Sequence, residues 1–159
     1  MKFIVSQKLI DNRALYISVL WMVVFLIVAL NLSIVTKEID FGNTPTQWSN
    51  HVFGNEEQFI QPLTIKDLLL TLHTELFGLI LVFILISALF MRTSRSKIIK
   101  TTLLVSSIAS LLLYPLGLLA SLWIGNISIM VSWSGWVTFH LLMILSALDI
   151  LILLLRKRF

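Results

Sequence analysis

The sequence predicts an all-α integral membrane protein, a bundle of four transmembrane helices. Of its 159 residues, 58% are hydrophobic and 13% are charged, whereas about 25% of the residues in soluble domains are charged. Four apolar stretches each reach the ~20 residues that a helix rising ~1.5 Å per residue needs to cross ~30 Å of hydrocarbon. These stretches are continuous and rich in Leu and Ile, without the alternation of barrel strands, so they favour helices.

The predicted spans cover residues 15–35, 68–91, 101–124 and 129–155. The apolar core of the first span is longer than the ~7–15 residues of a secretory signal, so we expect a retained anchor. The second helix is expected to start at Thr64, because Asp67 follows at the position of a capping box. The connection 36–63 is too short for an independent domain, so residues 1–159 are predicted to form a single transmembrane domain.

Charge predicts the orientation of the chain. Ten of the twelve basic residues lie at span ends that would share one side of the membrane: Lys2, Lys8, Arg13, Arg92, Arg95, Lys97, Lys100, Arg156, Lys157 and Arg158. The connection 36–63 carries four acidic residues against Lys37. The positive-inside rule therefore predicts cytoplasmic termini (N-in/C-in) and a short outer loop over 36–63. This topology and contact with anionic lipid explain the net charge of +4 without nucleic acid as a partner.

Several kinds of chemistry are excluded or unsupported. The chain has no cysteine, which excludes disulfides, thiolate nucleophiles, iron–sulfur ligation and covalently attached haem. It also lacks a P-loop, a dinucleotide glycine fingerprint, H-E-x-x-H and G-x-S-x-G, the usual signatures of nucleotide and hydrolytic enzymes. We therefore do not expect an enzyme that acts on its own.

Two histidines in different spans are candidates for a shared cofactor. Counted from the basic ends at ~1.5 Å per residue, His73 and His140 lie at a similar depth, ~24–29 Å from the inner surface. Such a pair could ligate one haem b or a metal ion, with Phe77 and Trp136 as walls of the pocket. Equally, both could be interfacial histidines bonded to carbonyls or water. His51 is a possible third metal ligand, although a solvated loop histidine is the simpler interpretation.

Two carboxylates within the spans are candidates for proton or ion exchange. Glu75 lies ~200° around the helix from His73, so the two point in different directions; the alternative is a carboxylate that reaches the outer interface. Asp149 lies ~10 Å inside the hydrocarbon and on the face of the fourth helix opposite His140. This opposition predicts another membrane chain, or a second copy, against the fourth span. Alternatively, Asp149 reaches the basic tail or a neighbouring serine at its depth: Ser87, Ser106 or Ser107.

The third span carries one narrow face of small and polar residues, with spacings of three, four, three and four. Its members are Ser107, Ser110, Tyr114, Gly117 and Ser121. A face of this kind is typical of close helix packing in membranes. Pro115 removes a backbone donor and is expected to kink the helix, which would give Tyr114 room to bond a ligand.

The stretch His73-Thr-Glu75-Leu76-Phe77-Gly78, followed by an apolar run, a basic turn and a third span ending in Leu-Trp, resembles a family of four-span bacterial inner-membrane proteins. Members of that family carry H-x-H-L-F-G at this place, and some also carry a c-type haem motif in the outer loop. The resemblance implies a multi-pass protein of a bacterial inner membrane and a redox setting. This chain has Glu75 in place of the second histidine and no C-x-x-C-H. The placement of its histidines also resembles that of b-type cytochromes.

Three functions remain open from the sequence. The first is a small subunit of a redox or respiratory assembly that transfers electrons through a haem b held by His73 and His140. The second is a noncatalytic accessory or assembly subunit of a larger membrane complex. The third is an ion or proton transport component that uses Asp149 and Glu75.

Overall fold

The computed structural model describes residues 12–156 and is helical throughout this range, apart from connections and one isolated bridge between Asn55 and Ile60. Four long helices are apolar enough to cross a membrane: α1 (Arg13–Phe41), α3 (Ile65–Phe90), α4 (Lys97–Ile124) and α5 (Asn126–Leu155). The predicted four-helix membrane bundle is confirmed. Of the basic residues used to predict the orientation, Lys2, Lys8, Lys157 and Arg158 lie outside the described residues.

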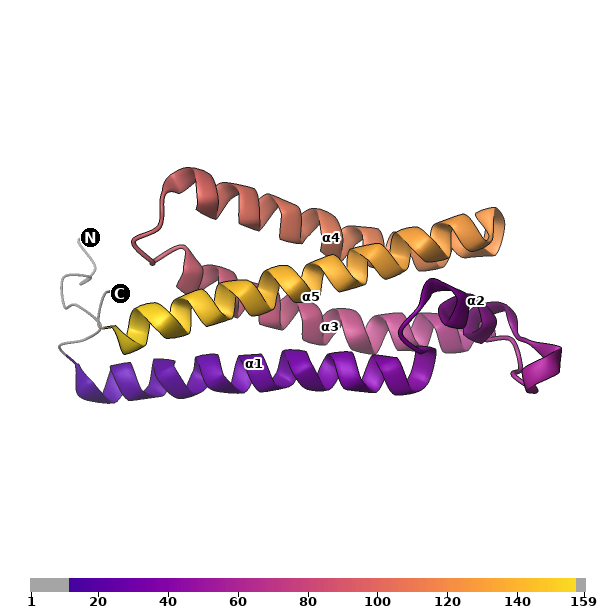
Figure 1. Cartoon of the computed structure of the whole chain (residues 1–159), viewed down its shortest axis with the longest axis horizontal. Coiled ribbons are helices and arrows are strands. Elements are labelled where there is room, and N and C mark those ends of the chain that lie inside the picture. The colour runs from indigo at the N-terminus through magenta and orange to yellow at the C-terminus, as the bar shows by residue number, and fades with distance from the viewer. Residues whose placement is uncertain (1–11, 157–159) are drawn as a thin grey trace.

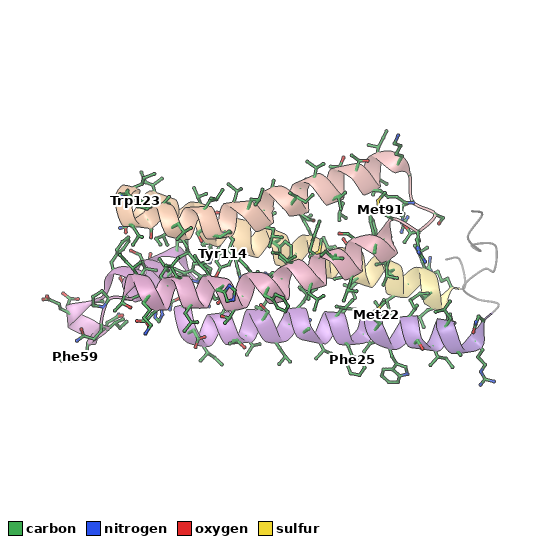
Figure 2. The ribbon with its side chains drawn as sticks, turned by 180° about the vertical axis from the view of Figure 1, so that it is seen from behind. Met22, Phe25, Phe59, Met91, Tyr114 and Trp123 are labelled. Atoms are coloured by element: carbon green, nitrogen blue, oxygen red, sulfur yellow. The ribbon has the colours of Figure 1, made fainter. Side chains whose placement is uncertain are left out.

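The four long helices run side by side and alternate in direction, with α5 in contact with each of the other three (Figure 1). The start of α1, the α3–α4 connection and the end of α5 lie at one end of the bundle, which we call the terminal end. The short helix α2 and the α4–α5 turn lie at the opposite end, which we call the α2 end. Figure 2 shows Phe25 and Trp123 projecting outward, whereas Tyr114 lies among the helices. Exposed apolar side chains such as Phe25 are those that lipid would cover.

The connection 36–63 contains more regular structure than the sequence analysis assigned to it. Helix α1 continues to Phe41, and α2 (Pro45–Phe53) and the 3₁₀ turn η2 (Glu56–Gln58) follow. The start of α2 has a complete capping box. The side chain of Thr44 accepts from the backbone N–H of Gln47, the side chain of Gln47 accepts from the backbone N–H of Thr44, and Pro45 follows the cap. This Thr-Pro-x-Gln pattern is a helix-start signal that was present in the sequence. The predicted cap at Thr64 is confirmed, because its side chain accepts from the backbone N–H of Asp67.

Helices α4 and α5 form the tightest pair, joined by Gly125 alone. Gly125 has φ 76° and ψ −145°, a conformation essentially restricted to glycine, and this allows the chain to reverse in one residue. A Cβ on Gly117 would lie 2.7 Å from the backbone nitrogen of Ser132, and one on Gly135 would lie 2.9 Å from the carbonyl oxygen of Ser110. The backbones of α4 and α5 therefore touch where small residues face each other, as close packing in membranes requires.

Candidate functional site

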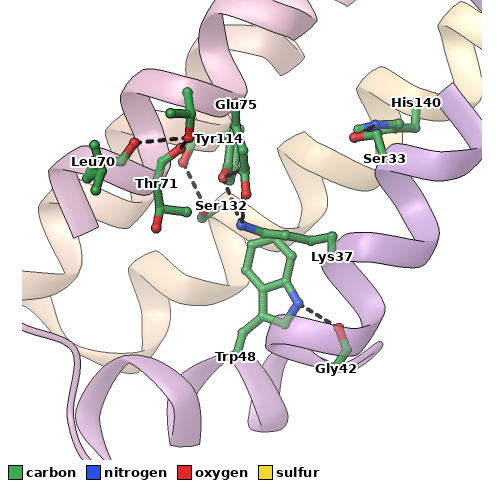
Figure 3. Close-up of polar contacts among 11 residues, drawn as sticks. Ser33, Lys37, Gly42, Trp48, Leu70, Thr71, Glu75, Tyr114, Ser132 and His140 are labelled. Carbon is green, nitrogen blue, oxygen red and sulfur yellow. Dashed lines mark hydrogen bonds and ion pairs between the residues drawn. The ribbon is translucent and has the colours of Figure 1, made fainter. Parts of the chain in front are cut away.

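A cluster of three ionisable side chains from three helices lies inside the α2 end of the bundle (Figure 3). Lys37 of α1 places its Nζ 2.8 Å and 3.1 Å from the two carboxylate oxygens of Glu75 of α3. The same Nζ donates to the hydroxyl oxygen of Tyr114 of α4 at 3.0 Å, and that hydroxyl donates to Glu75. We call these three residues the polar cluster. Lys37 is 3% exposed and Tyr114 0% exposed, while the side chain of Glu75 is 27% exposed, so Glu75 is the most accessible member.

Aromatic rings enclose the ammonium group of the polar cluster. Nζ of Lys37 lies 3.6 Å from the ring centroid of Phe41 and 5.0 Å from that of Trp48. Trp48 is fully buried, donates from its indole to the carbonyl of Gly42 at 2.9 Å, and packs edge-on against Tyr114. Cation–π attraction in a site removed from water holds the charge of Lys37 in place. The short helix α2 therefore has a definite role, which is to close the polar cluster with Trp48.

The sequence analysis missed this use of Lys37 because it assigned the residue to an exposed loop. The structure corrects that assignment, since Lys37 lies in α1 on the same face as the buried residues Leu26, Leu30 and Phe41. These positions recur at helical spacing, four, seven and four residues apart. The periodicity therefore continued past the apolar run, and this was the signal that could have placed Lys37 inside.

Tyr114 of the polar cluster is positioned by the close contact between α4 and α5. The predicted packing face of α4 is buried at all five positions: Ser107, Ser110, Tyr114, Gly117 and Ser121. Of these, Gly117 lies against the backbone of α5. Helix α4 continues through Pro115. The hydroxyl of Ser132 on α5 donates to the backbone carbonyl of Tyr114 at 2.7 Å. The side chain of Tyr114 bonds Lys37 and Glu75, the two residues that the sequence analysis did not connect to it.

His140 lies near the polar cluster but does not share a site with His73. The Nδ1–H of neutral His140 donates to the carbonyl of Trp136 at 2.9 Å, and Nε2 faces the hydroxyl of Ser33 at 3.1 Å. His140 is 1% exposed, whereas His73 is exposed on α3, two residues from the inward-facing Glu75. Among residues 12–156 no hydrogen bond or aromatic contact links the two histidines.

The residues proposed to hold haem do not fit that group within one chain. Both ring nitrogens of His140 have protein partners, and His73 points away from them. Phe77 is 73% exposed and so is not a pocket wall inside the bundle, while Trp136 is buried with its ring 4.2 Å from that of His140. A bis-histidine haem needs two nitrogens on opposite sides of one cavity. His73 and His140 of one chain therefore do not form such a pair in this structure.

A small groove opens between α1 and α5 beside His140. Its volume is about 190 Å³, and it is lined by apolar, aromatic and polar side chains: Ile34, Glu38, Gly42, Asn43, Trp133, Trp136, Val137, His140 and Leu141. We call it the α1–α5 groove. Leu141 at its edge is 57% exposed, so the groove is open on a face of the bundle that lipid would cover.

His51 of α2 packs its ring 4.2 Å from the ring of Phe41. Burial, and secondarily the positive charge of Lys37, lower the pKa of His51, while Asp40 raises it. Within residues 12–156, no three or more His, Asp or Glu side chains come together as a metal site. His51 is therefore placed as a packing residue of the aromatic enclosure.

Asp149 forms a second ion pair at the terminal end. Both of its carboxylate oxygens accept from the guanidinium of Arg95, which lies in the α3–α4 connection. The hydrogen bond and the charge of Asp149 raise the pKa of Arg95. Ser107, one of the suggested partners, bonds its own helix at Leu103. His140 and Asp149, on opposed faces of α5, both have partners within the chain, so neither side chain needs another chain to satisfy it.

The comparison with protein families supports the fold. Residues 42–159 match the model of the family Aq_1264_TM, described as a transmembrane helical domain. Neither curated proteins nor solved structures gave a match. The matched region includes α2, α3, α4 and α5, hence Glu75 and Tyr114 of the polar cluster and Trp48, which packs beside them. The match covers more than half of the chain, and the protein therefore belongs to this family of transmembrane helical domains.

Proposed function

We propose that this protein is a small membrane subunit of a redox assembly, in which Glu75 of the polar cluster exchanges protons near one membrane surface. The observation that carries the proposal is the Lys37–Glu75–Tyr114 cluster itself. Ionisable residues inside a membrane domain are costly, and by default they indicate a functional site. Glu75 is partly exposed and bonded to two other groups that can hold or donate a proton.

The charge distribution favours chemistry at one surface over transport across the membrane. No Asp, Glu, Lys or Arg lies in residues 14–36, 76–91, 101–124 or 126–148, so charged groups gather at the two ends of the bundle. A transporter of ions or protons needs a path of polar groups through the middle. A redox subunit needs proton exchange only where its substrate reacts. The electrons would pass to a redox centre in a partner chain, such as a haem or an iron–sulfur cluster.

The proposed orientation places the polar cluster on the outer side of a bacterial inner membrane. Arg13, Arg92, Lys97, Lys100 and Arg156 all belong to the terminal end, and basic residues mark the cytoplasmic side. The α2 end, with Glu75, would then face outward.

A second candidate is a noncatalytic accessory subunit. It is favoured by one observation, namely that Lys37, Glu75 and Tyr114 satisfy one another and join α1, α3 and α4. In this case the polar cluster would fix the helix arrangement, and partner chains would carry all the chemistry.

One experiment separates the two candidates. The tagged full chain is isolated with its partners in mild detergent, and reduced-minus-oxidised infrared difference spectra are recorded on an electrode. The redox proposal predicts a carboxyl band that appears in the wild type and in Asp149→Asn but is lost in Glu75→Gln. An assembly without a redox centre, or spectra that are identical in the wild type and in Glu75→Gln, would reject the proposal in favour of the accessory role.

A further inference from the structure

The α1–α5 groove contains hydrogen-bond acceptors that the polar cluster does not use. Because Nδ1 of neutral His140 donates to the carbonyl of Trp136 at 2.9 Å, its Nε2 carries the lone pair. That nitrogen accepts from the hydroxyl of Ser33 at 3.1 Å. Glu38 also lines the groove, makes no ion pair among the described residues, and has only a long contact of 3.4 Å with the amide of Asn43. A ligand of this groove should therefore donate hydrogen bonds.

The size and walls of the groove point to a single ring. Its volume of about 190 Å³ is below the ~300–1,000 Å³ of sites that enclose a whole drug-sized ligand. Trp133 and Trp136 provide flat walls, and Ile34, Val137 and Leu141 provide apolar ones. Flat rings pack well against aromatic side chains. The exposed edge at Leu141 would let an apolar tail remain in the lipid.

The charges of the groove argue against a phospholipid head group. No Lys or Arg lines it, and the ammonium group of Lys37 is paired with Glu75. A phosphate would lie beside the carboxylate of Glu38 without a cation to balance it, which is unfavourable in a medium of low dielectric constant. A neutral ring with hydroxyl groups meets no such penalty.

We propose that the α1–α5 groove binds the head group of a lipid-soluble quinol, with hydroxyl groups donating to Nε2 of His140 and to the carboxylate of Glu38. The ligand hydroxyl takes the place that the hydroxyl of Ser33 holds in the free protein. The oxidised quinone carries only carbonyl acceptors, so it cannot donate to Nε2 of His140 or to the carboxylate of Glu38 and binds more weakly. This inference rests on the proposed function, since it names the substrate class of the same end of the bundle.

The test measures binding alone. The full-length protein is placed in nanodiscs of phosphatidylcholine, and duroquinol or duroquinone is titrated under anaerobic conditions while tryptophan fluorescence is recorded. Duroquinol is expected to bind about tenfold more tightly than duroquinone, the ratio that corresponds to one hydrogen bond of ~1.4 kcal/mol. Equal affinity for the two forms, or no saturable quenching, would overturn the proposal.

Variants locate the site. Glu38→Gln is expected to weaken duroquinol binding severalfold. The control is Asp40→Asn, because Asp40 is an exposed carboxylate in the same turn of α1 that does not line the groove; this variant should bind duroquinol as the wild type does. Ser33→Ala, which removes the competing hydroxyl, should strengthen binding. If Glu38→Gln and Asp40→Asn bind alike, the quinol lies elsewhere and the proposal is rejected. Saturable quenching by phosphatidylethanolamine that is lost in Glu38→Gln, without saturable binding of duroquinol, would likewise reject it in favour of an amine head group.

The failure of this inference can be told apart from failure of the proposed function. Binding to the groove is measured without turnover and depends on Glu38 and Ser33, whereas the infrared experiment depends on Glu75. Quinol binding together with unchanged spectra in Glu75→Gln would retain the groove and reject the proton-exchange role. A Glu75-dependent band without quinol binding would do the opposite.

Discussion

Lys37 and Glu75 lie 38 positions apart in the sequence, and their side chains form a part-buried ion pair with Nζ 2.8 Å from Oε1. Removing one partner of a fully buried pair leaves an uncompensated charge, which typically costs about 3–5 kcal/mol. Because Glu75 is partly exposed and keeps its hydrogen bond from Tyr114, Lys37→Met is expected to lower the free energy of unfolding by less than this, about 1–3 kcal/mol, measured by denaturant titration in mixed micelles. Lys66→Met, an exposed lysine of α3, is the matched control and should change little.

The double variant Lys37→Met/Glu75→Gln tests whether the two side chains are coupled. Because the second substitution removes the charge that the first leaves unpaired, the double variant should be more stable than the sum of the single effects predicts. Strict additivity of the two single effects would show that the ion pair does not contribute as the geometry indicates.

The contact between α4 and α5 predicts opposite effects at two glycines. Gly117→Ala places a Cβ 2.7 Å from backbone atoms of Ser132, and overpacking of this kind costs about 1–3 kcal/mol. At Gly78 a Cβ meets no atom within 4 Å, so Gly78→Ala should be neutral or stabilising by about 0.5–1 kcal/mol. Thermal unfolding of the purified protein in detergent gives both values. Equal melting temperatures for the two variants would contradict the close seam.

The ion pair at the terminal end is expected to restrain the α3–α4 connection. Asp149→Asn removes the carboxylate that accepts from Arg95, so backbone amides of residues 92–96 should exchange faster with deuterium. Because exposed ion pairs are screened by salt, wild-type protein at high ionic strength should approach the exchange rate of the variant. Exchange that neither the substitution nor salt alters would show that the connection is held by other contacts, such as those of Lys100 with the carbonyls of Met91 and Thr93.

His51 should make stability depend on pH in the acidic range. Burial lowers its pKa in the folded protein below the ordinary value of 6.5, so at intermediate pH the unfolded chain binds more protons than the folded one. The contribution of His51 is fully present above pH 6.5 and is lost as the pH falls through the folded pKa. The free energy of unfolding of the wild type should therefore decrease on acidification more than that of His51→Asn. Parallel pH profiles of the two proteins would contradict this assignment.

The visible spectrum tests the bis-histidine haem directly. Since His73 is exposed and both nitrogens of His140 have protein partners, we expect the singly purified chain to give no reduced-minus-oxidised b-type signal. A haem signal in the isolated chain that is lost in both His73→Ala and His140→Ala would show that the two histidines share a haem after rearrangement or between two copies.

The sequence by itself determined the membrane fold, because long apolar runs leave the backbone no stable state in lipid other than a helix. It also indicated the small-residue face of α4, since spacings of three and four project on one side of a helix whatever its neighbours are. The start of α2 could also have been predicted from the sequence, because the capping residues Thr44 and Gln47 lie within one turn.

Only the tertiary structure decided which polar groups meet. Depth along a helix suggested pairing His73 with His140, but depth leaves the rotation of each helix about its axis undefined. In the folded protein Glu75 faces inward and His73 outward, and the last turns of α1 place Lys37 against Glu75 and Tyr114. Asp149 likewise accepts a hydrogen bond from Arg95, 54 positions away in the sequence. Contacts of this range depend on how four helices rotate against one another, and that rotation is set by the sum of their packing faces rather than by any one segment.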